Sequence, residues 1–272
     1  MNDYFGKNAE ELKNKKLWLL DMDGTIYEDD RLFDGALDLL DTITNMGGRY
    51  VFITNNSSKS VIDYVEKVKR LGIKAEFDNF FTSAQATIQF LKCNYPEAKV
   101  YCQGTKSLIM ELIESGVNVT EDVENVDIVL VGFDMELTME KVRKTCQILS
   151  TQDVIYIATN PDWVCPTSFG FIPDCGSICG MIKKATNKWP FFIGKPEDNM
   201  VKIVMEKYKV KPENTVVVGD RLYTDIATGI NAKVSSVCVL TGEATIEEIK
   251  QSNIKPTFVF ENVRNIANLI MK

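Results

Sequence analysis

Short apolar runs alternate with segments of helical periodicity along the chain, and several of the runs end abruptly in polar residues. The first run, Leu17–Leu20, is followed at once by two carboxylates, Asp21 and Asp23. A continuous apolar run of this length predicts a strand buried on both faces, as in a parallel sheet flanked by helices. Because active sites in such sheets lie beyond the carboxyl ends of the strands, these two side chains are candidates for chemistry.

The same alternation continues to the C-terminus and predicts an α/β fold. Residues from 82 onward repeat the alternation as a second series, for which we expect a separate sheet and core. A segment at 169–180, rich in Gly, Ser and Cys, leads into a short helix that we expect Ser177 to cap. Further strands are predicted at 50–53, 99–102, 128–132, 154–158, 191–193, 215–218, 235–240 and 258–260, and helices at 33–45, 60–71, 84–93, 138–150 and 263–271, with one more ending at 114.

The aspartates after the first strand are two residues apart, so in extended backbone both carboxylates point the same way. Two ionised carboxylates this close repel each other, unless one is protonated or a cation lies between them. Either arrangement suits a phosphoryl-transfer site that uses magnesium. The alternative is an ordinary turn or helix cap, because Asp21-Met22-Asp23-Gly24 is also typical of turns.

A second polar cluster, Thr54, Asn55 and Asn56 with the two serines that follow, comes after the strand predicted at 50–53. A hydroxyl, amides and free backbone N–H groups before a helix can bind an oxyanion. The same residue types also favour helix N-caps, so a capping cluster for the helix at 60–71 is the alternative.

Three other strand ends carry polar residues. Lys195 follows the strand at 191–193, where an isolated lysine is ordinarily just solvated. Asp220 and Asp225 follow the strand at 215–218, and Asp225 could simply cap the next helix. Asn160 and Asp162 follow the strand at 154–158, where turn chemistry around the intervening proline is the alternative to substrate contact.

Composition narrows the class of protein. The chain has 272 residues, 45% of them hydrophobic, which is enough for one large domain or two. A net charge of -7 argues against a nucleic-acid partner. No apolar stretch is long enough for a membrane helix, and the first sixteen residues do not resemble a signal peptide. Seven irregularly spaced cysteines favour reduced thiols, so we expect a cytoplasmic location and no membrane partner.

The chain contains no histidine, which limits the possible acid–base groups to Asp, Glu, Lys, Tyr and Cys. The absence of histidine also argues against a zinc site. Cys175 and Cys179 are four residues apart and could share a helix face, but no further ligands cluster with them, so we interpret them as structural thiols.

Taken together, the polar strand ends resemble the four motifs of the haloacid dehalogenase (HAD) superfamily of aspartate-nucleophile phosphatases. The match is closer to the subgroup of NagD and the p-nitrophenylphosphatases, and it covers nearly the whole chain. It rests on DMDGTIY at 21–27, TNNS at 54–57, ATNPD at 158–162, GKP at 194–196 and GDRLYTD at 219–225.

The resemblance implies a Rossmann-like, doubly wound parallel sheet as the catalytic core, made of residues 1–81 and 189–272. It also implies an inserted α/β cap domain, residues 82–188, that sets substrate specificity. In this family pattern Asp21 is the nucleophile that forms an aspartyl-phosphate, and Asp23 is the general acid and base.

The remaining motif residues would bind metal and phosphate. The resemblance implies a magnesium ion (Mg2+) held by Asp21, the backbone carbonyl of Asp23 and Asp220. Asp225 would lie behind these ligands and act either through a bound water or by orienting Lys195. Phosphate oxygens would be bound by Thr54, Asn55, Asn56 and Lys195. Asn160 and Asp162 are the candidate substrate contacts of the cap.

The expected function is therefore a magnesium-dependent phosphomonoesterase of small phosphorylated metabolites. Sugar phosphates, nucleoside monophosphates, phosphoglycolate and p-nitrophenyl phosphate are typical substrates of the resembled subgroup. A phosphomutase or a catalytically idle metabolite-binding protein on the same scaffold are the alternatives, while the presence of Asp23 disfavours a dehalogenase. The cap could provide the surface for a homodimer, but no coiled-coil pattern indicates one, so the oligomeric state stays open.

Overall fold

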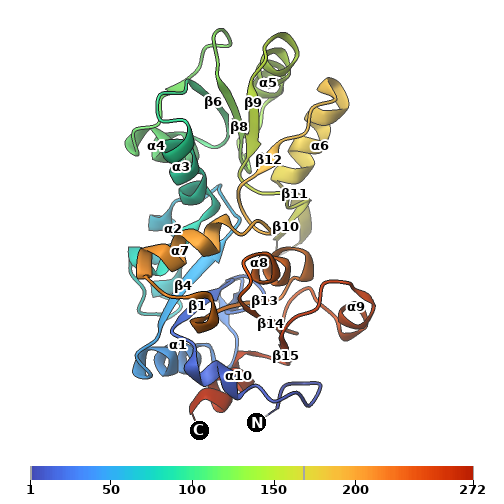
Figure 1. Ribbon diagram of the computed structural model, residues 1–272. Helices are drawn as coiled ribbons and strands as arrows, with labels where there is room; N and C mark the ends of the chain where they lie inside the picture. The colour runs from blue at the N-terminus through green and yellow to red at the C-terminus, as the bar shows by residue number, and fades with distance from the viewer. Residues whose placement is uncertain (1, 168, 272) are drawn as a thin grey trace. The chain divides into compact units, whose positions relative to one another are not determined.

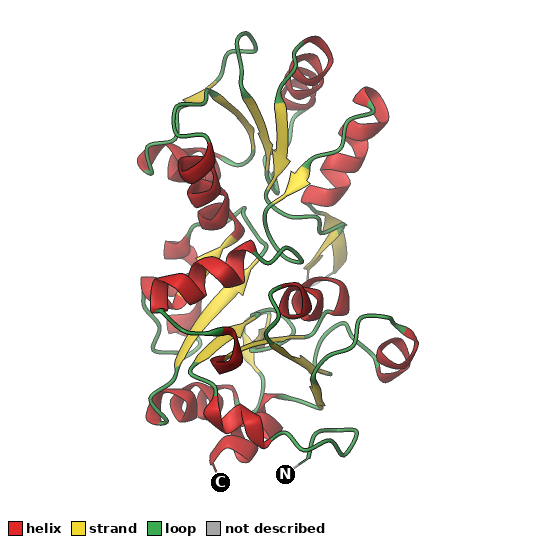
Figure 2. Ribbon diagram, in the orientation of Figure 1, coloured by secondary structure: helices red, strands yellow, loops and turns green. Residues whose placement is uncertain are grey.

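The structure, a computed structural model, describes residues 2–167 and 169–271. The chain divides into two compact units, each with its own sheet and helices (Figures 1 and 2). The first unit takes in Met1–Thr54, Val65–Phe81 and Lys195–Lys272, and the second takes in Asn55–Tyr64 and Thr82–Gly194. The predicted α/β fold class is confirmed.

The first unit is built on a six-stranded sheet in the order β15-β14-β13-β1-β4-β5. Counted along the chain, this is the order 3-2-1-4-5-6 of a doubly wound Rossmann-like sheet, read from β5. The order reverses between β1 and β13, which pair in parallel, so the crevice for a ligand is expected at their carboxyl ends. The strands are β1 (Leu17–Leu20), β4 (Arg49–Thr54), β5 (Phe80–Thr82), β13 (Thr215–Gly219), β14 (Ser235–Val239) and β15 (Phe258–Phe260).

Apolar burial explains why these segments are strands. All four residues of β1 and all five of β13 are buried, as a central strand covered on both faces requires. The amphipathic helices α1 and α10 pack against each other in this unit. The helices are α1 (Ala36–Asn45), α7 (Asn199–Tyr208), α8 (Ala227–Asn231), α9 (Ile246–Gln251) and α10 (Val263–Met271), and α2 (Val61–Arg70) runs from the second unit into the first.

Several short elements complete the first unit. They are the hairpin of β2 (Tyr27–Glu28) and β3 (Arg31–Leu32), the 3-10 turns η1 (Glu10–Asn14), η2 (Phe77–Asn79) and η3 (Pro212–Asn214), and the π-helical turn η4 (Leu222–Ile226).

The second unit has a five-stranded parallel sheet in the order β12-β9-β8-β6-β7 and a separate antiparallel hairpin, β10-β11. Its strands are β6 (Val100–Gln103), β7 (Val119–Thr120), β8 (Ile128–Val131), β9 (Ile155–Ala158), β10 (Val164–Thr167), β11 (Gly170–Pro173) and β12 (Phe191–Phe192). Its helices are α3 (Ser83–Asn94), α4 (Lys106–Glu114), α5 (Met139–Thr151) and α6 (Cys175–Thr186).

Strand β8 shows how this second sheet is buried on both sides. Ile128 and Leu130 belong to a core cluster formed with α3 and α4, whereas Val129 and Val131 belong to a cluster formed with α5 and α6. Alternate residues of a strand point to opposite faces, so a strand without a polar face needs helices on both. The unbroken apolar run at 128–131 therefore follows from this sandwiched position.

The unit bounds differ from the predicted ones at two places. Asn55–Tyr64 group with the second unit, where Ser83 donates a hydrogen bond to the Asn55 carbonyl. Residues 189–194 also group with the second unit, because β12 pairs with β9. The role of the second unit in substrate specificity stays a prediction.

The segment at 169–180 differs from its prediction. Helix α6 begins at Cys175, and its N-cap is Asp174 rather than Ser177. The Ser177 hydroxyl instead donates to the carbonyl of Trp163. The hairpin β10-β11 was not predicted, because its strands are short and lack a clear apolar alternation, and β11 is largely exposed.

Among the described residues, no helix is both long and apolar enough to cross a membrane.

Candidate active site

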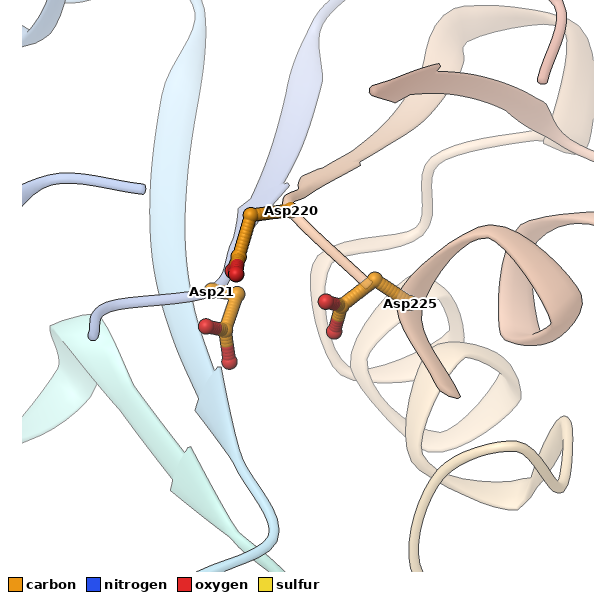
Figure 3. Close-up of side chains that lie close together, drawn as sticks. All are labelled: Asp21, Asp220 and Asp225. Atoms are coloured by element: carbon orange, nitrogen blue, oxygen red, sulfur yellow. The ribbon is translucent and has the colours of Figure 1, made fainter. Parts of the chain in front are cut away.

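Three of the predicted site residues come together at the reversal point of the first sheet. Asp21 extends β1, since its N–H donates to the Val218 carbonyl of β13 at 2.8 Å. Asp220 directly follows β13, and Asp225 lies in the turn η4 that comes next. Carboxylate oxygens of Asp21, Asp220 and Asp225 all lie within 4.8 Å of one another, and Figure 3 shows the three side chains gathered together.

Lys195 joins this cluster. Its Nζ lies 2.5 Å from Asp21 Oδ1 and 2.6 Å from Asp225 Oδ1, and it also donates to the Ile53 carbonyl. Its side chain is only 4% exposed, so the solvated lysine considered as an alternative is not what the structure shows. Burial opposes its positive charge, yet the two carboxylates outweigh that effect and raise the pKa of Lys195.

Burial also governs the acidic members of the cluster. Burial raises the pKa of Asp21 well above its usual value, while the neighbouring Lys195 acts to lower it. Burial, followed by the charge of Asp225, raises the pKa of Asp220 to about 6. The Asp220 carboxylate accepts hydrogen bonds from Thr25 Oγ1 at 3.2 Å and from the Glu243 N–H at 2.8 Å.

Asp225 does not act as a simple helix cap. One of its carboxylate oxygens accepts from Lys195, and the other accepts from the N–H of Arg221 at 3.1 Å. Gly219 permits this arrangement, because a Cβ at that position would lie 2.3 Å from the Asp225 Cβ. The side chain is thereby aimed at the cluster.

A divalent cation fits the residues present. When the three carboxylates are ionised and Lys195 is protonated, the buried cluster keeps two negative charges. Two glycines leave room around the Asp220 carboxylate. A Cβ on Gly24 would lie 2.6 Å from Asp220 Oδ2, and a Cβ on Gly242 would lie 2.0 Å from it. Carboxylate oxygens are the ligands that magnesium prefers, so the donor set also suits that ion.

Asp23 has different partners from Asp21. The chain turns after it, because Gly24 has a φ of +83° and its N–H donates to the Tyr27 carbonyl. The Asp23 side chain is 51% exposed, and its Oδ1 lies 3.7 Å from Lys67 Nζ on α2.

The cluster after β4 does not cap α2. Asn56 Oδ1 accepts from the N–H and hydroxyl of Ser58, which makes a local turn. The helix is capped further on, where Ser60 and Asp63 exchange side-chain and backbone hydrogen bonds. Thr54 is buried at the end of β4. The capping interpretation of residues 54–58 is therefore not supported.

In the second unit, Asn55, Asn160 and Asp162 belong to one buried polar network. Asp162 Oδ2 accepts from Asn55 Nδ2 at 2.9 Å and from Asn160 Nδ2 at 3.2 Å. Asn160 Nδ2 also donates to Asp174, the N-cap of α6. A local turn around Pro161 does not account for these contacts, because they join residues distant in the sequence. They also hold the Asn55 side chain in place. Substrate contact by Asn160 or Asp162 stays a prediction.

Sequence reasoning missed three contributors to the first unit's site: Thr25, Glu243 and Lys67. Thr25 lay inside the first motif but received no role. The loop at 241–243 follows an apolar run next to β13, which was a usable signal. Lys67 lies within a helix whose other basic residues are exposed, so nothing in the local sequence distinguished it from them.

Comparison with known proteins shows which family the sequence matches. The chain matches the family "Haloacid dehalogenase-like hydrolase" over residues 18–118 and a HAD-hydrolase-like family over residues 192–266. An acid sugar phosphatase of Staphylococcus haemolyticus is 36% identical over 256 residues, covering 94% of this chain and 96% of that protein.

Solved structures give the same result. A 4-nitrophenylphosphatase from Thermotoga maritima has a TM-score of 0.91 and 39% identity, covering 96% of this chain and 99% of that one. NagD from E. coli K-12 has a TM-score of 0.84 and 31% identity, covering 92% and 97%. The chain belongs to the haloacid dehalogenase-like hydrolase family. Within that family it is an enzyme, a NagD-like phosphatase.

Proposed function

We propose that the chain is a magnesium-dependent phosphomonoesterase that hydrolyses small phosphorylated metabolites through an aspartyl-phosphate on Asp21. The observation that carries the proposal is the buried cluster at the end of β1 and β13. There, Lys195 bridges Asp21 and Asp225 while Asp220 stands within 4.8 Å. Such a cluster supplies both a carboxylate nucleophile and fixed charges that favour the anionic transition state of phosphoryl transfer.

In the first half-reaction a carboxylate oxygen of Asp21 attacks phosphorus, and the bond from phosphorus to the leaving oxygen breaks. Asp23 gives its proton to that oxygen, so the alcohol departs neutral. Lys195 favours the ionised form of Asp21 despite burial and offsets the charge of the incoming phosphate.

In the second half-reaction Asp23, now ionised, takes a proton from water, and the water oxygen attacks phosphorus. The bond between phosphorus and Asp21 breaks, which releases inorganic phosphate and regenerates the starting protonation states. No other acid–base group is required, which suits a chain without histidine.

Magnesium would be held by Asp21, the backbone carbonyl of Asp23 and Asp220, with Asp225 beside them. When bound, it supplies positive charge that stabilises the transferring phosphoryl group. Thr54, Asn55, Asn56 and Lys195 are proposed to bind the phosphate oxygens.

Relatives named acid sugar phosphatase and 4-nitrophenylphosphatase support phosphomonoesters as the substrate class. Sugar phosphates are the first candidates, followed by nucleoside monophosphates, phosphoglycolate and p-nitrophenyl phosphate. A cytoplasmic location and a homodimer stay predictions of the sequence.

The test is phosphate release from a panel of these esters, with magnesium and with a chelator. We expect release that requires magnesium. Isomerised sugar phosphate without inorganic phosphate would instead identify a phosphomutase. Ligand-induced stabilisation without turnover of any ester would identify an idle metabolite-binding protein.

A further inference from the structure

We propose that Lys67 is a positioning residue that holds the Asp23 carboxylate in the orientation from which it serves the leaving group. This inference rests on the proposed function, in which Asp23 is the general acid. Lys67 belongs to α2, outside the sequence motifs that carry the family resemblance.

The placement of Lys67 is unusual for a lysine on this helix. Its side chain is only 17% exposed, whereas Glu66, Lys69 and Arg70 beside it are all exposed. A lysine on an amphipathic helix ordinarily extends its ammonium group into water. A special environment must therefore favour the inward position of this one.

Two contacts define that environment. The Lys67 ammonium lies 3.9 Å from the centroid of the buried Tyr27 ring, and 3.7 Å from Asp23 Oδ1. A cation over an aromatic face is attracted by the ring electrons, and more strongly where water is excluded. The ring thus fixes the ammonium, and the ammonium attracts the carboxylate.

Tyr27 also fixes the backbone at Asp23. Asp23 forms a β-bridge with Tyr27, and the Gly24 N–H donates to the Tyr27 carbonyl at 2.9 Å. The Asp23 side chain is half exposed, and these backbone contacts do not fix its orientation. Lys67 supplies the restraint on the side chain that the turn itself does not.

The inference predicts an effect that depends on the leaving group. Transfer from 4-nitrophenyl phosphate needs little help from an acid, whereas transfer from phenyl phosphate, of nearly the same shape, needs much more. The quantity to compare is kcat/KM, because it covers the steps up to the first irreversible one and excludes hydrolysis of the aspartyl-phosphate.

The experiment measures kcat/KM for both esters in the unaltered chain and in Lys67→Met, Lys67→Arg, Lys69→Met and Asp23→Asn. Lys67→Met is expected to lower the value for phenyl phosphate about tenfold, and that for 4-nitrophenyl phosphate less than about threefold. Asp23→Asn should lower the ratio of kcat/KM for phenyl phosphate to kcat/KM for 4-nitrophenyl phosphate still further. Lys67→Arg should restore most of the ratio, because it keeps a cation over the ring.

Lys69→Met is the matched control, since it removes the same charge from an exposed position of the same helix. It should leave the ratio unchanged. If Lys67→Met fails to fold, as judged by its melting curve, Lys67→Gln carries the same comparison.

Equal losses for the two esters, or no loss, would overturn the role of Lys67 while the proposed function stands. Absence of phosphate release by the unaltered chain would overturn the proposed function, and this inference with it.

Discussion

At the scale of single residues, Lys195 explains how three carboxylates can share a buried space. A carboxylate loses its hydration when it is buried, and a neighbouring carboxylate adds repulsion. Lys195 lies between Asp21 and Asp225 within 2.6 Å of an oxygen of each, which offsets part of both costs. The sequence indicated the position of this lysine at a strand end, and the family resemblance allowed for its contact with Asp225, but its contact with Asp21 was not predicted.

Replacing Lys195 by Met should destabilise the protein by about 3 kcal/mol, because two buried carboxylates lose their partner. Urea unfolding in the presence of a chelator measures this, since a bound cation could otherwise substitute for the ammonium. Lys202→Met is the control, because Lys202 is 61% exposed in its ion pair with Asp198 and its loss should cost less than about 1 kcal/mol. Equal losses in the two variants would contradict the account of Lys195.

At the scale of elements, the ends of α1 show why two glycines with similar backbone angles have unequal importance. Gly35 precedes the helix with a φ of +82°, and Gly47 follows it with a φ of +71°. A Cβ on Gly35 would lie 2.5 Å from the Cα of Arg264 on α10, whereas a Cβ on Gly47 would meet nothing within 4 Å. Close packing of α1 against α10 therefore depends on Gly35.

Gly35→Ala should destabilise the protein by about 3 kcal/mol. Two costs add together: the strain of an alanine at positive φ, and the clash of its Cβ with the backbone of Arg264. Gly47→Ala should cost only about 1 kcal/mol, because the strain acts alone. Urea unfolding of both variants measures the difference. A smaller loss for Gly35→Ala than for Gly47→Ala would show that α10 can move aside without cost.

At the scale of the whole molecule, the sequence predicted the alternating elements and the strand ends that carry Asp21, Lys195 and Asp220. It could do so because buried parallel strands are unbroken apolar runs whose carboxyl ends share one edge. It could not predict that Asn55 would bond to Asp162, because 107 positions separate the two residues and only packing brings them together. The hairpin β10-β11 was missed because its short strands lack a clear apolar alternation.

The cluster of carboxylates should make the stability of the protein depend on magnesium. A ligand that binds only the folded state, at a free concentration of a hundred times its Kd, adds about 2.7 kcal/mol to the free energy of unfolding. Magnesium should therefore raise Tm measurably. Asp220→Asn should remove most of that rise, because Asp220 is a proposed ligand. An equal rise in Tm for Asp220→Asn and the unaltered chain would place the ion elsewhere.

The central claim is that phosphate passes through a covalent bond to Asp21. The most direct measurement is rapid acid quenching of the enzyme during turnover of 4-nitrophenyl phosphate with magnesium, followed by mass spectrometry of its peptides. The account predicts one phosphoryl group on the peptide that contains Asp21, and neither the modified peptide nor phosphate release in the folded variant Asp21→Asn. Continued phosphate release by Asp21→Asn, or a phosphoryl group on another residue, would contradict it.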